Sequence, residues 1–139
     1  MRIVLSLMCW VVCAGLAIAQ EAENPGLGVE LNTLADAADG CQLTFVATTS
    51  YENGVDKAVF ETVLFAKDGA VNRLTLFDFG AIPAGRPRVR QFVIPELACA
   101  DLGQILINGV NTCEAPGMEA TACAAGLKVT SRINVALIG

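Results

Sequence analysis

From Leu27 onward the sequence is divided into short apolar runs by glycine, proline, aspartate and asparagine. Asn53-Gly54 and Asp68-Gly69 are dipeptides typical of tight turns, and Asp68-Gly69 predicts a hairpin between the runs on either side of it. The runs are rich in valine, isoleucine, threonine and phenylalanine, which favour pleated sheet. This spacing of short runs and turns predicts an all-β fold, either a sandwich or a barrel.

We expect one domain at residues 27–139, built as a seven-strand β-sandwich. The predicted strands are residues 27–34, 41–49, 58–66, 71–79, 89–94, 102–110 and 127–138. The third run is apolar on both faces apart from Glu61 and Thr62, so it is expected to be a central strand. The last run alternates apolar and polar residues, as a half-buried strand does. A single helical turn is expected within residues 95–104.

Residues 1–19 have the organisation of a secretory signal peptide. Arg2 supplies a positive charge, residues 3–16 are apolar apart from Ser6, and Ala17-Ile18-Ala19 forms a small-x-small cleavage site. Arg2 is a single arginine, so a twin-arginine signal is disfavoured. A lipoprotein signal is also disfavoured, because neither cysteine of the segment follows a small residue.

Residues 20–26 are polar and acidic and contain Pro25-Gly26, which predicts a flexible leader between the signal peptide and the domain. The apolar run of the signal is shorter than the ~20 residues of a spanning helix. After cleavage we therefore expect no stable membrane span. The predicted location is the periplasm or the extracellular medium.

Composition excludes several classes of function. The chain is 54% hydrophobic, too apolar for a disordered protein. It contains 9 Lys and Arg against 14 Asp and Glu, for a net charge of −5, whereas a nucleic-acid-binding protein has a basic surface. Histidine is absent from the sequence, which removes the commonest general base and metal ligand.

Removing the signal peptide leaves four cysteines, Cys41, Cys99, Cys113 and Cys123. Their wide spacing, without any Cys-x-x-Cys, is unlike that of zinc sites or redox motifs and predicts two disulfides. If successive strands alternate in direction, Cys41 and Cys99 fall at one end of the sandwich. The other two cysteines share the loop between the last two strands. We predict the pairs Cys41–Cys99 and Cys113–Cys123.

Arg86, Arg88 and Arg90 are the candidate binding residues. In an extended chain these alternate positions share a face, which would form a row of guanidinium groups suited to carboxylates or phosphates. A structural interpretation, which we favour on general grounds, is an edge strand protected by charge and proline. The carboxylates of Asp68, Asp78 or Glu96 are candidates to neutralise the row.

Catalytic chemistry has little support in the sequence. Ser50 and Ser131 are the serines left after signal removal, with no histidine to activate either. Asp36 and Asp39 flank a turn, and the acid-dense loop of a calcium site is lacking. Phe77 and Phe79 share a strand face and are expected in the core. We predict no metal and no cofactor.

Several segments resemble a family of small exported alphaproteobacterial proteins, some labelled as carrying twin-arginine signals and none with an assigned activity. The segments that carry the resemblance are 31–34, 39–46, 61–65, 74–80, 83–92 and 99–102, and the similarity covers nearly all of residues 20–139. More distantly, Asn53-Gly54, Asp68-Gly69 and residues 83–85 resemble immunoglobulin-like modules of the FxLYD type. This resemblance implies an immunoglobulin-like sandwich and supplies no catalytic residues.

Together these observations predict an exported, non-catalytic β-sandwich that binds or supports an envelope protein or an anionic ligand. Two alternatives stay open. One is an enzyme that uses carboxylates in a pocket lacking a recognisable motif, and the other is a purely structural or stress-protective domain. The sequence does not determine the oligomeric state.

Overall fold

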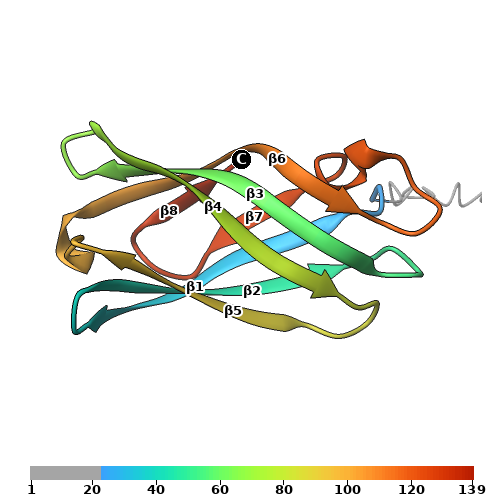
Figure 1. Cartoon of the computed structure of the whole chain (residues 1–139), viewed down its shortest axis with the longest axis horizontal. Coiled ribbons are helices and arrows are strands. Elements are labelled where there is room, and N and C mark those ends of the chain that lie inside the picture. Colours follow the sequence, from blue (N-terminus) through green and yellow to red (C-terminus); the bar gives the residue numbers. More distant parts are fainter. Residues whose placement is uncertain (1–22) are drawn as a thin grey trace, which may run out of the picture.

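A computed structural model of the chain describes residues 23–139 (Figure 1). The predicted signal peptide and the first residues of the predicted leader lie outside the described residues. Eight strands and two short 3-10 helices occur in this part of the chain. Their bounds are β1 Leu27–Ala37, β2 Gly40–Thr49, β3 Val55–Ala66, β4 Val71–Ile82, β5 Arg88–Pro95, η1 Cys99–Asp101, β6 Leu102–Glu114, η2 Ala120–Cys123, β7 Lys128–Ser131 and β8 Ala136–Ile138.

The strands form two four-stranded sheets, and the all-β prediction is confirmed. Sheet A has the order β5-β2-β1-β7, and sheet B has the order β4-β3-β6-β8. Figure 1 shows the two sheets as layers, with β4, β3, β6 and β8 in one and β5, β2, β1 and β7 in the other. β3 lies between β4 and β6, as expected from a run that is apolar on both faces.

The prediction of seven strands is wrong at the C-terminal end. The predicted strand at 127–138 is two strands: β7 pairs parallel with β1 in sheet A, and β8 pairs parallel with β6 in sheet B. Between them the chain turns back at residues 132–135 and crosses to the other sheet (Figure 1). Ile133 and Val135 in this crossing still pack against the core, so the alternation of apolar residues continues where the strand does not.

Both predicted turns form. Gly69 adopts a φ of +88°, and its N–H donates to the Ala66 carbonyl at 2.9 Å, closing the β3–β4 hairpin. A left-handed φ of this kind favours glycine. Gly54 has a φ of +69° in the connection from β2 to β3, which carries the chain from sheet A to sheet B.

The core lies between the two sheets. Along β2, the side chains of Leu43, Phe45 and Ala47 are almost completely buried, whereas the residues between them are half-buried. Phe77 and Phe79 of β4 are buried as predicted. Five of the six phenylalanines of the sequence form one cluster. Its members are Phe45, Phe60, Phe77, Phe79 and Phe92.

Both predicted disulfides are present. Cys41 at the start of β2 is bonded to Cys99 of η1, and Cys113 of β6 is bonded to Cys123 of η2. β2 and β5 run antiparallel, with Cys41 opposite Ile94, so the start of one and the end of the other meet as predicted. Two disulfides in a domain of this size are typical of an oxidising, non-cytoplasmic compartment.

The predicted helical turn within 95–104 is η1, which leads directly into β6. No helix among residues 23–139 has the length and apolar character needed to cross a membrane.

Candidate functional site

The three candidate arginines lie at one side of the molecule but do not share one role. Arg86 is exposed in the β4–β5 connection, ahead of the strand. Arg88 and Arg90 are half-buried in β5, which is an edge strand of sheet A. The two point to the same side of β5, since alternate residues of a strand share a face.

Arg90 joins the open edges of the two sheets. Its Nε donates to the carbonyl of Phe79 at 2.6 Å, and one terminal guanidinium nitrogen donates to the carbonyl of Ala81 at 3.1 Å. Both carbonyls belong to β4, the edge strand of sheet B. The Arg90 guanidinium therefore satisfies edge carbonyls that lack a strand partner, which supports the structural interpretation for this one arginine.

We expect Arg90→Met to lower the free energy of unfolding by about 1.5 kcal/mol, because charge-assisted hydrogen bonds to two carbonyls are lost. Arg88→Met is the matched control, since Arg88 donates only to the neighbouring carbonyl of Pro87. Its expected effect is below about 0.5 kcal/mol. Denaturant unfolding measures both, and equal losses in the two variants would contradict the assigned role of Arg90.

Arg86 and Arg88 form no ion pair within residues 23–139. Of the three carboxylates expected to neutralise the row, Asp78 is instead 3.9 Å from the ammonium of Lys57, and the other two form no ion pair in the described part of the chain. Two guanidinium groups thus remain available on a chain whose net charge is −5. Pro87 lies between them and restricts the backbone there.

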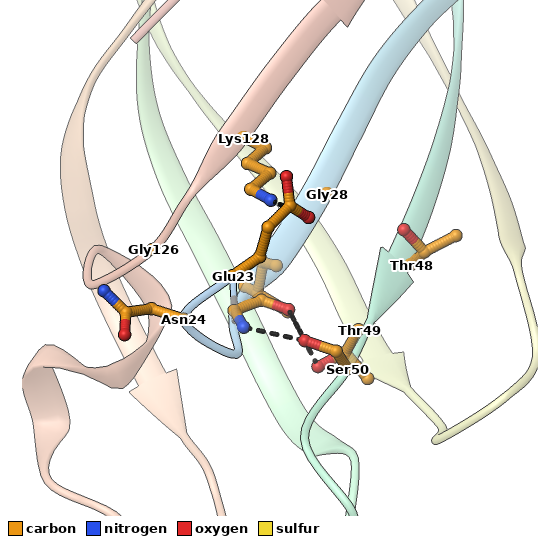
Figure 2. A pocket seen from close by; sticks show the side chains of 10 residues that line it. Glu23, Asn24, Gly28, Thr48, Thr49, Ser50, Gly126 and Lys128 are labelled. Carbon is orange, nitrogen blue, oxygen red and sulfur yellow. Dashed lines mark hydrogen bonds and ion pairs between the residues drawn. The ribbon is translucent and has the colours of Figure 1, made fainter. Parts of the chain in front are cut away.

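A hollow of about 370 Å³ lies at the end of the sandwich where β1 begins and β2 ends (Figure 2). The Ser50 hydroxyl accepts a hydrogen bond from the Gly26 N–H at 2.9 Å and lies 3.3 Å from the Gly26 carbonyl. Gly26 is itself buried, so this last residue of the predicted leader is held against β2. Both contacts bind the Ser50 hydroxyl to the backbone of Gly26.

The charges of the hollow also pair with each other. Lys128 of β7 forms an ion pair with Glu23, and this contact lowers the pKa of the Glu23 carboxyl. A general acid at neutral pH needs the opposite, a carboxyl with a raised pKa. Because histidine is absent from the sequence, Ser50 has no imidazole base either. The hollow therefore does not support the enzymatic alternative.

A neighbouring hollow of about 430 Å³ is lined by Tyr51, Asn53 and Met118 among others. Tyr51 is buried, and its hydroxyl donates to the carbonyl of Ala122 at 2.6 Å. This hydrogen bond ties the β2–β3 connection to η2, beside the Cys113–Cys123 disulfide. The Tyr51 side chain is thus part of the scaffold.

Asp36 at the end of β1 and Asp39 in the β1–β2 turn lie with Glu96 around a third hollow. Glu96 has a φ of +59°, and its N–H donates to the Asp39 carbonyl at 2.8 Å. In residues 23–139, no group of three or more histidine, cysteine, aspartate or glutamate side chains is arranged to hold a metal ion.

The sequence interpretation missed an apolar outer surface on sheet B. Leu74 and Leu76 of β4 point away from the core and are exposed, whereas Phe77 and Phe79 point inward. The sequence feature that could have indicated this surface is the presence of apolar residues on both faces of the expected strands at 58–66 and 71–79.

No protein-family model, curated protein or solved structure matches this chain.

Proposed function

We propose that this chain is an exported, non-catalytic binding module that recognises an acidic segment of an envelope protein through Arg86 and Arg88. The observation that carries the proposal is that neither guanidinium has a carboxylate partner within residues 23–139. Lys67, Arg73 and Arg132 also form no ion pair in this part of the chain, but they belong to separate segments, whereas Arg86 and Arg88 are two positions apart. Two neighbouring unpaired arginines form a local positive site on a negative molecule.

The chemistry of arginine suits this partner. A guanidinium group donates two parallel hydrogen bonds to one carboxylate, and it keeps its charge at every physiological pH. Arg86 is exposed and Arg88 half-exposed at the start of β5, so both can approach a partner from the side of the sandwich. Arg90 contributes by holding β5 against β4 rather than by contacting the partner.

We also propose that the domain has an immunoglobulin-like topology. In its favour, β1-β2-β5 and β4-β3-β6 match the order of strands A-B-E and C′-C-F of immunoglobulin domains. β8 lies where strand G would be expected but runs parallel to β6, and β7 adds to β1. The resemblance to FxLYD modules and to the small exported family is part of the same proposal.

Mild crosslinking in an envelope extract, followed by recovery of the tagged protein, tests the function. The double variant Arg86→Ser/Arg88→Ser is expected to recover the partner at least tenfold less than the unmodified protein, because two charge-assisted contacts are lost. Lys67→Ser/Arg132→Ser is the control. It removes the same charge from two exposed cations in the β3–β4 turn and after β7.

Equal recovery of the partner by both double variants would contradict the proposal, because net charge alone would then explain binding. Recovery of no partner by the unmodified protein would also contradict it. Salt provides an internal check, since binding through two exposed guanidinium groups is expected to weaken as ionic strength rises.

A further inference from the structure

The outer surface of sheet B carries a row of apolar side chains that crosses all four strands. Val63 of β3 is opposite Leu74 of β4 on one side and Leu106 of β6 on the other, and Leu106 is opposite Ile138 of β8. Residues directly opposite each other in a sheet point to the same face. We name these four residues the cross-strand row.

Further apolar residues widen this row. Phe65 is opposite Val71, and Leu76 follows Leu74 on the same side of β4. Four of the side chains on this surface are well exposed: Val71 at 62%, Leu74 at 57%, Leu76 at 51% and Ile138 at 42%. Soluble monomers seldom expose contiguous apolar patches beyond a few hundred Å², and a larger one marks a contact surface.

The opposite surface of the molecule shows that the fold does not require an apolar exterior. The outer face of sheet A presents polar side chains in its central strands, among them Glu30, Thr44 and Thr48. Lys128 and Thr130 continue this polar surface on β7. Val89 and Val93 of β5 are exposed on this face as well, but the apolar pair Val89 and Val46 is followed by Glu30 on β1. An apolar row that crosses all four strands is found on sheet B.

Lys57 is the cation on the outer face of sheet B, and it lies beside a carboxylate. The Glu61 carboxylate accepts a hydrogen bond from the Asn108 amide at 2.6 Å. Lys57 and Asp78 lie 3.9 Å apart. No unpaired cation is left among the outward-facing residues of this sheet, so an anionic lipid surface has nothing to attract it. A chain of net charge −5 would be repelled by such a surface.

We infer that the occupant of this face is a second copy of the same chain, packed sheet against sheet about a two-fold axis parallel to the strands. This goes beyond the proposed function and uses a different surface. Such an axis reverses the cross-strand row in the partner. Leu74 then lies against Ile138 of the second copy and Val63 against Leu106, so exposed ends of the row cover each other.

The same axis keeps the charged end of the face away from the apolar end. Glu61 of one copy falls near Asn108 of the other, and Lys57 falls near Glu114 of the other. Sheets pack in this aligned manner at roughly 10 Å, with strands about 30° apart. In a two-fold dimer each contact occurs twice.

The available area is sufficient. β4, β3 and β6 have 12 or 13 residues each, and β8 adds three more, so at the usual strand spacing the face measures roughly 600 Å². Standard interfaces bury roughly 600 to 1,000 Å² on each partner. The face of sheet B therefore has the size that a stable two-fold dimer needs.

Sedimentation equilibrium over a concentration series tests the inference on the mature protein and two variants. We expect the unmodified protein to be a dimer. Leu74→Asp is expected to raise the dissociation constant of the dimer at least 30-fold, because the two-fold axis buries one aspartate from each copy in the interface. Val89→Asp is the control. Val89 is also 57% exposed on an edge strand, but it lies on the outer face of sheet A.

A monomeric unmodified protein at the highest concentration would overturn the inference, and so would a dimer that Leu74→Asp leaves intact or that Val89→Asp weakens equally. Thermal unfolding confirms that each variant is folded. These outcomes are independent of Arg86 and Arg88, so failure here leaves the proposed binding function untouched.

Crosslinking with a short bismaleimide tests the direction of the axis. Mixing Leu74→Cys chains with Ile138→Cys chains is expected to give a crosslinked dimer, because the two positions face each other. In Leu74→Cys alone, the two cysteines would be roughly 17 Å apart, beyond the reach of the reagent. Equal crosslinking of the single variant and the mixture would overturn the proposed packing.

Discussion

Replacing Cys41 and Cys99 together with alanine is expected to lower the free energy of unfolding by about 4 kcal/mol. The disulfide joins residues 58 apart in the sequence, and in the chain-entropy model a loop of this length constrains the unfolded chain by that amount. Its position adds to its importance. It links the start of β2 in sheet A to η1, the turn from which the chain enters sheet B as β6.

Denaturant unfolding of the oxidised protein measures this loss, and the second disulfide is the control. Cys113→Ala/Cys123→Ala removes a link between residues only 10 apart, so the expected loss is about 3 kcal/mol. Reduction of the unmodified protein by dithiothreitol is expected to destabilise it by more than either double variant. A larger loss from the shorter link would contradict the ranking by loop length.

The disulfide pairing could be predicted from the sequence because it depends only on the direction of successive strands. Cys41 begins a run, and Cys99 follows the end of another run three strands later. Antiparallel neighbours bring such ends together, and the pairing of Cys41 with Ile94 across β2 and β5 satisfies this condition.

The division of residues 127–138 into β7 and β8 could not be predicted in the same way. Alternation of apolar and polar residues reports which side of a strand is buried, but it does not identify the neighbouring strand. Ile133 and Val135 pack against the core from the crossing between the sheets, so the pattern continues through the break. Only the pairing partners, β1 and β6, distinguish two strands from one.

The candidate site shows a similar limit. Local sequence predicts that Arg88 and Arg90 share a face, and both point to the same side of β5. The role of Arg90 depends on the carbonyls of Phe79 and Ala81, which reach it only because the β4 and β5 edges meet. A contact between edges of different sheets is not encoded in the spacing of the arginines.

The apolar outer surface of sheet B could not be predicted from the sequence for a different reason. β4 contains leucines on one face and phenylalanines on the other, so both faces of the strand satisfy the requirement for a core. The phenylalanines face inward, where their rings meet Phe45, and the leucines remain outside. When both faces are apolar, sequence alone does not identify the face that needs a partner.

Phe45→Ala is expected to destabilise the domain by about 4 kcal/mol, as deletion of a buried aromatic ring does. The ring of Phe45 is 1% exposed and lies within 6.0 Å, centroid to centroid, of the rings of Phe77, Phe79 and Phe92. It therefore joins β2 to β4 and β5 at once. Removing the ring leaves a cavity in the core and removes its tilted and edge-to-face contacts with the neighbouring rings.

Phe65→Ala is the control, because the same ring is removed from a half-exposed position on the outer face of sheet B. Its expected loss is about 1 to 2 kcal/mol, measured as before by denaturant unfolding. Losses of equal size would show that the aromatic cluster does not dominate the core.

The Phe45 variant also bears on the arginines. Phe45 is directly opposite Arg90 in the β2–β5 pair, so its ring supports the strand from which the Arg90 guanidinium reaches β4. If that support matters, adding Arg90→Met to Phe45→Ala should cost less than the 1.5 kcal/mol or so expected in the unmodified protein, since neighbouring contacts are not additive. A full additive loss would show that the core and the edge contact are independent. The geometry of the side that carries Arg86 and Arg88 would then depend on the sheet edges alone.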